Sequence, residues 1–335
     1  MKPTKINIPE ELKADLPSSR FGKILSATPV VMAVVATMLA GLASSEMTKA
    51  QYDRSLGAQQ QSKAGDQWSF FQAKRLRGAI QRNTADLLQA TTELHSFDPA
   101  TLEQWARNPS DSGSNSLNSE LRAVIDSAGG RRAMALLQSG EAPGIGSEPV
   151  LDPAIKAAVE GVETSTPDAE LASAINRVDQ KALDAALRAA RDQAEQFDAS
   201  TRPINQAIDQ LDAWMSRLAL AHPRAAAAGG DALGSLPRDF TAARLRYASL
   251  RYEIEARLNQ TIANLYEVQV RKSNISAEHH HRRSQRFFFG MLGAQAGVII
   301  STLAMAAKNR NLLWSIAAAA GLVAVAFAVY VFLYV

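Results

Sequence analysis

The sequence predicts an all-α membrane protein with three transmembrane helices, one near the N-terminus and a hairpin of two at the C-terminus. Three apolar runs without a charged residue support this fold class: 24–43, 287–307 and 312–335. A helix rises about 1.5 Å per residue, so about twenty apolar residues cross a hydrocarbon core of roughly 30 Å. The rest of the chain is rich in helix formers and has no convincing strand pattern.

The apolar runs divide the chain into segments. We expect a polar N-terminal segment at 1–23, a first membrane helix at 24–43, and a C-terminal membrane hairpin of 287–307 and 312–335. Small residues at 41–43 also fit a signal peptide that is cleaved there. The apolar run is longer than a usual signal peptide core and follows a long polar segment, so we favour a retained anchor.

The two arms next to the membrane, 44–97 and 238–286, are expected to form a long antiparallel helical stalk. They have nearly equal length and leave the bilayer on the same side, so pairing buries the apolar face of each. In the first arm the apolar positions are Tyr52, Leu56, Ala64, Trp68, Phe71, Leu76, Ile80, Leu87 and Leu94. In the second they are Ala243, Tyr247, Leu250, Ile254, Leu258, Thr261, Leu265 and Val268.

Residues 98–237 predict a helical head with linkers. Pro99 after Asp98 is typical of a helix start. We expect helices at 117–138, 171–197 and 204–221, the last two as a helical hairpin. Stretches rich in Ser, Gly, Pro and Ala predict loops at 110–116, 139–149 and 222–237.

Composition argues against several classes of function. The net charge is +3, and residues 44–286 contain 29 Lys and Arg against 30 Asp and Glu, so we do not expect nucleic-acid binding. The absence of cysteine excludes disulfides and thiolate metal sites. Gly144-Ile145-Gly146 lies before Pro149 and indicates a loop, not a phosphate-binding motif. We therefore expect no catalytic activity and no cofactor.

One motif in the first arm resembles a known family. Asp66, Trp68, Gln72 and Lys74, with Phe71 in place of Tyr, fit the pattern Asp-x-Trp-x-x-Tyr-Gln-Ala-Lys. This resembles the bacterial domain-of-unknown-function family 4337, over residues 24–96 and 265–335. Arg77 stands where a second Lys is usual in that family. The resemblance implies an architecture and a bacterial plasma membrane location, but no activity, because the family has none assigned.

The motif allows two interpretations. Trp68, Phe71 and Gln72 fall on one helical face, while Asp66 and Lys74 lie about two turns apart. Aromatic residues at this spacing usually belong to a core, so we favour packing against the second arm, with Gln72 fixing the register. The alternative is a surface that binds a ligand or partner.

A second cluster comprises His279, His280 and His281, followed by Arg282, Arg283 and Arg286. Consecutive helical residues point about 100° apart, so three adjacent imidazoles do not converge on one metal ion. We interpret the cluster as a collar that lies among the lipid headgroups, with Arg side chains reaching phosphates.

The apolar runs contain no ionisable residue, which weighs against a pump or a proton-coupled carrier. Gln295, Ser301 and Thr302 are the notable polar residues of the second run, and Gly293 and Gly297 are spaced for close helix packing. These residues predict helix packing or, in an oligomer, a pore lined by residues 287–307.

We expect a multi-pass membrane scaffold or interaction protein; the alternative is an oligomeric channel. The expected partners are the lipid bilayer, further copies of the chain, and a protein that binds the stalk or head. Lys13, Arg20 and Lys23 precede the first membrane helix and favour a stalk on the non-cytoplasmic side, although basic residues also lie on the stalk side.

Overall fold

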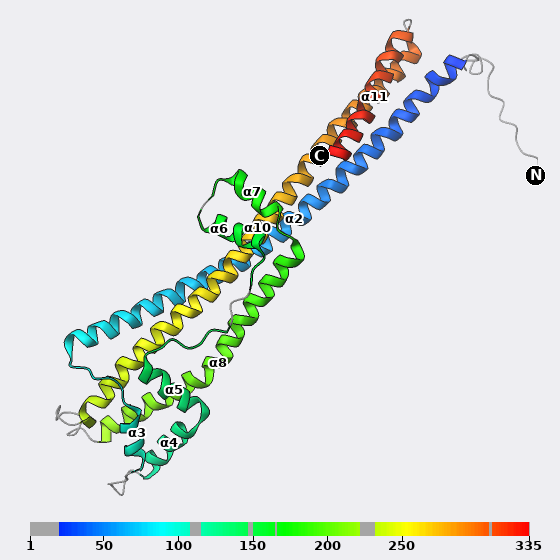
Figure 1. The fold of residues 1–335 in the computed structure, drawn as a ribbon. Helices are drawn as coiled ribbons and strands as arrows, with labels where there is room; N and C mark the ends of the chain where they lie inside the picture. Colours follow the sequence, from blue (N-terminus) through cyan, green and yellow to red (C-terminus); the bar gives the residue numbers. More distant parts are fainter. Residues whose placement is uncertain are drawn as a thin grey trace, which may run out of the picture. The chain divides into compact units, whose positions relative to one another are not determined.

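The computed structural model describes residues 20–107, 115–146, 150–164, 166–221, 232–307 and 310–334. Within these ranges the protein is all-helical, as predicted, with nine helices (Figure 1). They are α2 (Arg20–Thr91), α3 (Pro99–Arg107), α4 (Asn115–Asp126), α5 (Ala128–Ser139), α6 (Pro153–Glu163), α7 (Asp168–Asn176), α8 (Gln180–Ala221), α10 (Ala232–Ala306) and α11 (Arg310–Tyr334).

Three of the helices, α2, α10 and α11, are long and apolar enough to cross a membrane. This confirms the three predicted spans by length and composition. The chain divides into two compact units: a membrane unit of residues 1–58 and 271–335, and a polar unit of residues 59–270. The long helices α2 and α10 contribute to both units.

In the membrane unit, segments of α2, α10 and α11 pack through small residues. Met32 of α2 lies against Gly297 of α10 and Gly321 of α11, where any larger side chain would displace it. A buried cluster continues this packing with Ala36, Leu39, Ala43, Phe287, Ala294, Ala324 and Val331. Such close approach of backbones is the usual basis of helix association in lipid.

Two hydrogen bonds fix the levels of the membrane helices. The hydroxyl of Ser284 donates to the carbonyl of Ala43 at 2.7 Å. The last residue of the first apolar run therefore lies beside the start of the second run. The indole of Trp314 donates to the hydroxyl of Thr28 at 2.9 Å at the other end of the unit. Between residues 24 and 43 the helix rises about 29 Å, which matches the thickness of a hydrocarbon core.

The polar unit is built around α10. Residues 262–266 and 268–270 of α10 are buried, because α10 is covered by other helices of the unit. On one side, Arg82 and Gln89 of α2 bind Glu253 and Arg246 of α10 at 2.9 and 2.8 Å. On another side, Phe197 of α8 packs with Ile254 and Leu258.

The main hydrophobic core of the polar unit joins α3, α4 and α5 to α8 and the start of α10. Phe240 is fully buried at its centre, and its ring lies 5.7 Å from that of Phe97. Further members are Leu102, Leu121, Ile125, Met134, Leu137, Ile208, Leu211, Trp214 and Tyr247. As the sequence predicts, α3 begins at Pro99, and Asp98 accepts a hydrogen bond from the Ala100 amide at 3.0 Å.

The predicted hairpin of residues 171–197 and 204–221 is wrong. One helix, α8, runs from Gln180 to Ala221 with Pro203 inside it. Proline removes one helical hydrogen bond, but Phe197 and Ile204 on either side of it are buried in clusters that hold the helix together. Apolar packing thus outweighs the local effect of the proline.

Other boundaries also differ from the prediction. The helix expected at 117–138 is two helices, since Ser127 caps α5 by accepting a hydrogen bond from the Gly130 amide at 2.9 Å. Helix α6 was not predicted, and α10 begins before the expected position 238. Of the predicted loops, residues 110–114, 147–149 and 222–231 lie outside the described residues. Residues 140–146 are non-helical, as predicted, whereas 115–116 belong to α4 and 232–237 to α10.

Candidate functional site

In the polar unit, α2 has two regularly spaced stripes on opposite faces, one largely buried and one exposed. The inner stripe consists of buried or half-buried residues that repeat with steps of three and four: Gln60, Ala64, Gln67, Phe71, Lys74, Gly78, Gln81, Ala85 and Leu88. Every seventh position from Ala64 on is Ala, Phe or Gly. At Gly78 an added Cβ would lie 3.4 Å from the Ser249 carbonyl oxygen and the Tyr252 Cβ of α10. The inner stripe therefore faces α10.

The outer stripe also repeats with steps of three and four, and all its residues are exposed: Ala73, Leu76, Ile80, Asn83, Leu87 and Ala90. Leu76, Ile80 and Leu87 have exposed fractions of 63, 51 and 64%. From the sequence alone, these three are predicted to lie on the same buried face as Trp68 and Phe71. The structure separates them, because their spacing places them on the opposite side of the helix. Three exposed large apolar side chains in line make this stripe a candidate interaction surface.

The residues of the Asp66–Lys74 motif take different positions. Trp68 and Phe71 are half-buried and pack edge to face, with ring centroids 5.4 Å apart. The Lys74 ammonium group forms an ion pair with Glu255 of α10 and lies 5.5 Å from the centre of the Tyr252 ring. Asp66 and Gln72 are exposed. Lys74 thus links α2 to α10, while the exposed members are free to face solvent.

A charged cluster lies where α2 and α10 leave the apolar runs. Glu46 is only 6% exposed, and its carboxylate accepts hydrogen bonds from His280 Nδ1 at 2.6 Å and from Lys49 Nζ at 3.0 Å. Arg283 lies 4.0 Å from the same carboxylate. Sequence reasoning singled out His280 and Arg283 but missed Glu46. An acidic residue three positions after an apolar run was the available signal.

Burial raises the pKa of the Glu46 carboxyl, because it disfavours the charged form. The hydrogen bonds from His280 and Lys49 and the charge of Arg283 lower it by more, so the net pKa lies below the ordinary value. Glu46 is therefore a carboxylate at neutral pH, and it binds basic side chains just beyond the end of the first apolar run.

The remaining residues of the predicted collar do not join this cluster. His279 and Arg282 are exposed, and Arg282 donates to Glu278 at 2.9 Å. His281 lines an apolar groove on another side of α10. Among the described residues, no group of three or more His, Asp or Glu side chains is arranged to hold a metal ion. The three imidazoles point in different directions, as helical geometry requires.

In the membrane unit, Gly297 is buried against Met32 and the Ala317 carbonyl. A Cβ added at Gly293 would lie 4.0 Å from the Cβ of Ala324. Gln295 is exposed and, within the described part of the chain, has no hydrogen-bond partner. It lies near the middle of the second apolar run, where an unpaired amide in lipid is costly. These glycines face neighbouring helices, and Gln295 faces away from them.

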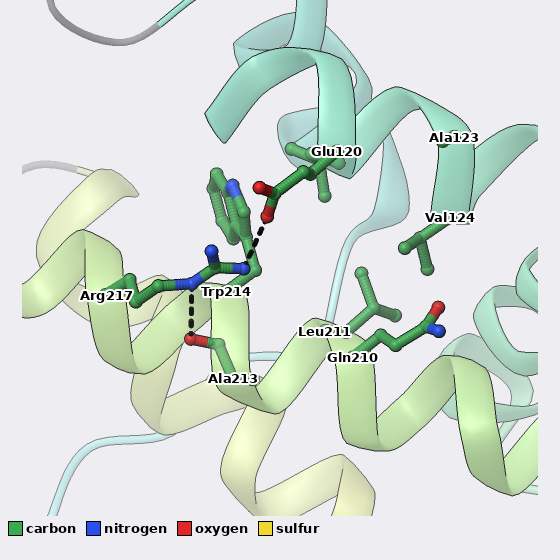
Figure 2. A pocket seen from close by; sticks show the side chains of 9 residues that line it. Glu120, Ala123, Val124, Gln210, Leu211, Ala213, Trp214 and Arg217 are labelled. Carbon is green, nitrogen blue, oxygen red and sulfur yellow. Dashed lines mark hydrogen bonds and ion pairs between the residues drawn. The ribbon is translucent and has the colours of Figure 1, made fainter. Parts of the chain in front are cut away.

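A surface pocket of about 370 Å³ lies between α4 and α8 of the polar unit (Figure 2). Its edge carries an ion pair between Arg217 and Glu120 at 2.7 Å, and Leu211 and Trp214 form its floor. Both charged side chains are about half-exposed and neutralise each other. The pocket therefore has no unpaired charge that would select a charged ligand.

The model of the family described as Domain of unknown function (DUF4337) matches residues 21–110. This confirms the resemblance for the N-terminal part of the chain, which contains the first apolar run, the Asp66–Lys74 motif and the outer stripe. The other part of the expected resemblance, residues 265–335, lies outside the match. No curated protein and no solved structure matches the chain significantly.

Proposed function

We propose that the protein is a membrane-anchored helical scaffold that associates with further copies of itself and has no catalytic activity. The observation that supports this most directly is the outer stripe of α2, Ala73 to Ala90, which is apolar, exposed and regularly spaced. A stripe with alternating steps of three and four residues is the pattern by which helices form coiled coils.

The second copy is the partner that best fits this stripe. Because α2 continues without a break from the first apolar run, two copies in one membrane present their α2 helices in parallel and at the same height. Asn83 then lies opposite Asn83 of the second copy. A single Asn within an apolar coiled-coil seam pairs with its equivalent and fixes the register.

The inner stripe supports a stalk within each copy. Residues of α2 in the order Lys74, Arg82 and Gln89 bind α10 residues in the reverse order, Glu255, Glu253 and Arg246. This order supports an antiparallel pair of helices. We propose that the pair extends from the membrane, on the non-cytoplasmic side of a bacterial plasma membrane, and presents the helices α3–α8 as a head that a protein partner binds.

Size measurement in a mild detergent tests self-association. We expect the wild-type chain to migrate as a dimer or larger species, and the double variant Ile80→Asp/Leu87→Asp to become monomeric, because two charges then lie in the seam. The control variant Gln59→Asp/Gln61→Asp places the same charges on α2 outside the outer stripe, at exposed positions on the flanks of the helix. It should remain associated.

Circular dichroism accompanies this measurement, so that a loss of association is not confused with unfolding. The substituted side chains are exposed, so both double variants should keep the helix content of the parent. A wild-type chain that is monomeric at every concentration, or an oligomer that survives both charges in the stripe, would reject the proposal.

A second candidate function is an oligomeric channel in which the membrane segment of α10 lines a pore. It is favoured by Gln295 and Thr302, which are both exposed on the membrane segment of α10. Ser301 does not support it, because its hydroxyl is buried and donates to the Val298 carbonyl at 2.9 Å. Bilayer recording of the purified protein tests this candidate: no conductance, or an unchanged conductance in Gln295→Leu, would argue against it.

A further inference from the structure

An apolar groove of about 670 Å³ runs along the membrane unit between α2 and α10, at the level where both helices leave their apolar runs. Its α2 wall is Ala40, Ala43, Ser44 and Met47, and its α10 wall is His281, Ser284, Gln285, Phe288, Phe289 and Met291. The hydrogen bond between Ser284 and Ala43 fixes this level, and the volume lies within the range of small-molecule sites, about 300–1,000 Å³.

The groove changes character along its length. Ala40, Phe288, Phe289 and Met291 belong to the half that faces the hydrocarbon core, and Phe288 and Phe289 are 48 and 65% exposed. Ser44, His281 and Gln285 belong to the half that faces the headgroups. An occupant must therefore have an apolar part on one side and a polar part on the other, which is the chemistry of a phospholipid.

The charge around the polar half selects an anionic headgroup. No Asp or Glu lines the groove. Arg282 lies on the same face of α10 as Gln285 and Phe289, three and seven residues away, and its Nε donates to Glu278. Arg54 of α2 is also close to that carboxylate, so two guanidinium groups accompany one acid. The remaining N–H groups of Arg282 are suited to a phosphate.

We propose that this groove binds one anionic phospholipid, with an acyl chain along Phe288, Phe289 and Met291 and with the phosphate beside Arg282, His281 and Ser44. The bound lipid covers exposed aromatic side chains and joins the two helices at the membrane boundary. It therefore stabilises the membrane unit. This inference does not depend on self-association through the outer stripe.

Thermal unfolding of the purified full chain in detergent, with added lipid, tests the proposal. The probes are dioleoyl phosphatidylglycerol, dioleoyl phosphatidylcholine and glycerol 3-phosphate. We expect phosphatidylglycerol to raise the thermal midpoint at about one fifth of the concentration that phosphatidylcholine needs for the same shift. A roughly fivefold difference in affinity is what one basic side chain contributes at an anionic lipid surface. Glycerol 3-phosphate should have no effect, because it lacks the acyl chains that the groove holds.

Three variants locate the site. Arg282→Gln should need about fivefold more phosphatidylglycerol for the same shift, with its response to phosphatidylcholine unchanged. Ala40→Trp should fill the apolar half and reduce the response to both lipids. Arg202→Gln is the matched control, since Arg202 is similarly exposed and pairs with an acid four residues earlier, Asp198, in the polar unit.

Two results would overturn the proposal. One is an equal response of the wild type to both lipids, and the other is an unchanged phosphatidylglycerol response in Arg282→Gln. A response to glycerol 3-phosphate that equals the response to phosphatidylglycerol would assign the site to free phosphates instead. If Ala40→Trp does not fold, Arg282→Gln alone decides, because its exposed side chain is not needed for folding.

Discussion

Glu46 is a buried carboxylate at the end of the first apolar run, and His280, Lys49 and Arg283 surround it. Its pKa is lowered in the folded protein. A lowered pKa contributes stability that is present above the unfolded value, about 4.3, and that is lost as the pH falls through the folded value. Glu46 therefore makes the membrane unit less stable as the pH becomes acid.

We predict that Glu46→Gln lowers the free energy of unfolding at pH 7 by about 1–3 kcal/mol, because it leaves the half-buried His280 and Arg283 without their carboxylate. The difference from the wild type should shrink as the pH falls below about 4. Thermal unfolding at a series of pH values checks this. Glu160→Gln, at an exposed glutamate 3.9 Å from Lys156, is the control and should match the wild type. A gap that persists at acid pH would contradict the role of Glu46.

Trp68 is half-buried. The sequence allows two interpretations of it, a residue packed in the stalk core and a residue of a partner surface, and its partial burial lies between the two. We predict that Trp68→Ala lowers stability by about 2–3 kcal/mol, below the 3–5 kcal/mol of a fully buried large aromatic residue. The control is Phe70→Ala on the same helix, which is 53% exposed and should change stability by less than about 0.5 kcal/mol. Equal melting of Trp68→Ala and the parent would instead make the motif a partner surface.

At the scale of elements, the contact between α5 and α8 is tight. An added Cβ at Gly129 of α5 would lie 2.5 Å from the carbonyl oxygen of Pro203 in α8, and a backbone atom cannot move aside as a side chain does. This contact lies at the proline of α8 and adds to the packing of Phe197 and Ile204 on either side of it.

We predict that Gly129→Ala destabilises the polar unit by about 1–3 kcal/mol through overpacking. Gly65→Ala is the matched control on α2, where no described atom outside the local helix lies within 4 Å of the added Cβ. It should stabilise by about 0.5–1 kcal/mol, since alanine favours helix more than glycine does. Chemical unfolding measures both, and effects of the same sign would refute this account of the α5–α8 contact.

The helices could be predicted where the local sequence alone determines them. The three apolar runs and the helix start at Pro99 follow from length, hydropathy and local capping. The continuity of α8 through Pro203 was not predictable, because tertiary packing of Phe197 and Ile204 decides it. The two stripes of α2 were merged into one, because apolar spacing shows that a helix is amphipathic but not that opposite faces have different partners.

The candidate sites were predictable only in part. His280 and Arg283 could be singled out as a local run of basic residues, but their partner Glu46 is more than two hundred residues away in the sequence. The groove between α2 and α10 depends on the register of two helices, which Ser284 and Ala43 fix in the folded chain. No pattern within one segment contains this information.

At the scale of the whole molecule, the two longest helices, α2 and α10, each combine a segment of the membrane unit with a segment of the polar unit. Helix α2 buries its inner stripe within the same chain and leaves its outer stripe exposed. In the proposed assembly, copies share one orientation in the membrane, so the same stripe meets itself in register.

The most direct test of this central claim uses the absence of cysteine from the chain. Asn83→Cys should form a disulfide between two copies under mild oxidation in intact membranes, because residue 83 lies opposite its equivalent in a parallel, in-register pair. Gln89→Cys, which faces Arg246 of α10 at 2.8 Å and not the outer stripe, should form little. Efficient cross-linking of Asn83→Cys alone is the predicted result. Equal cross-linking at both positions, or none at residue 83, would contradict the proposed assembly.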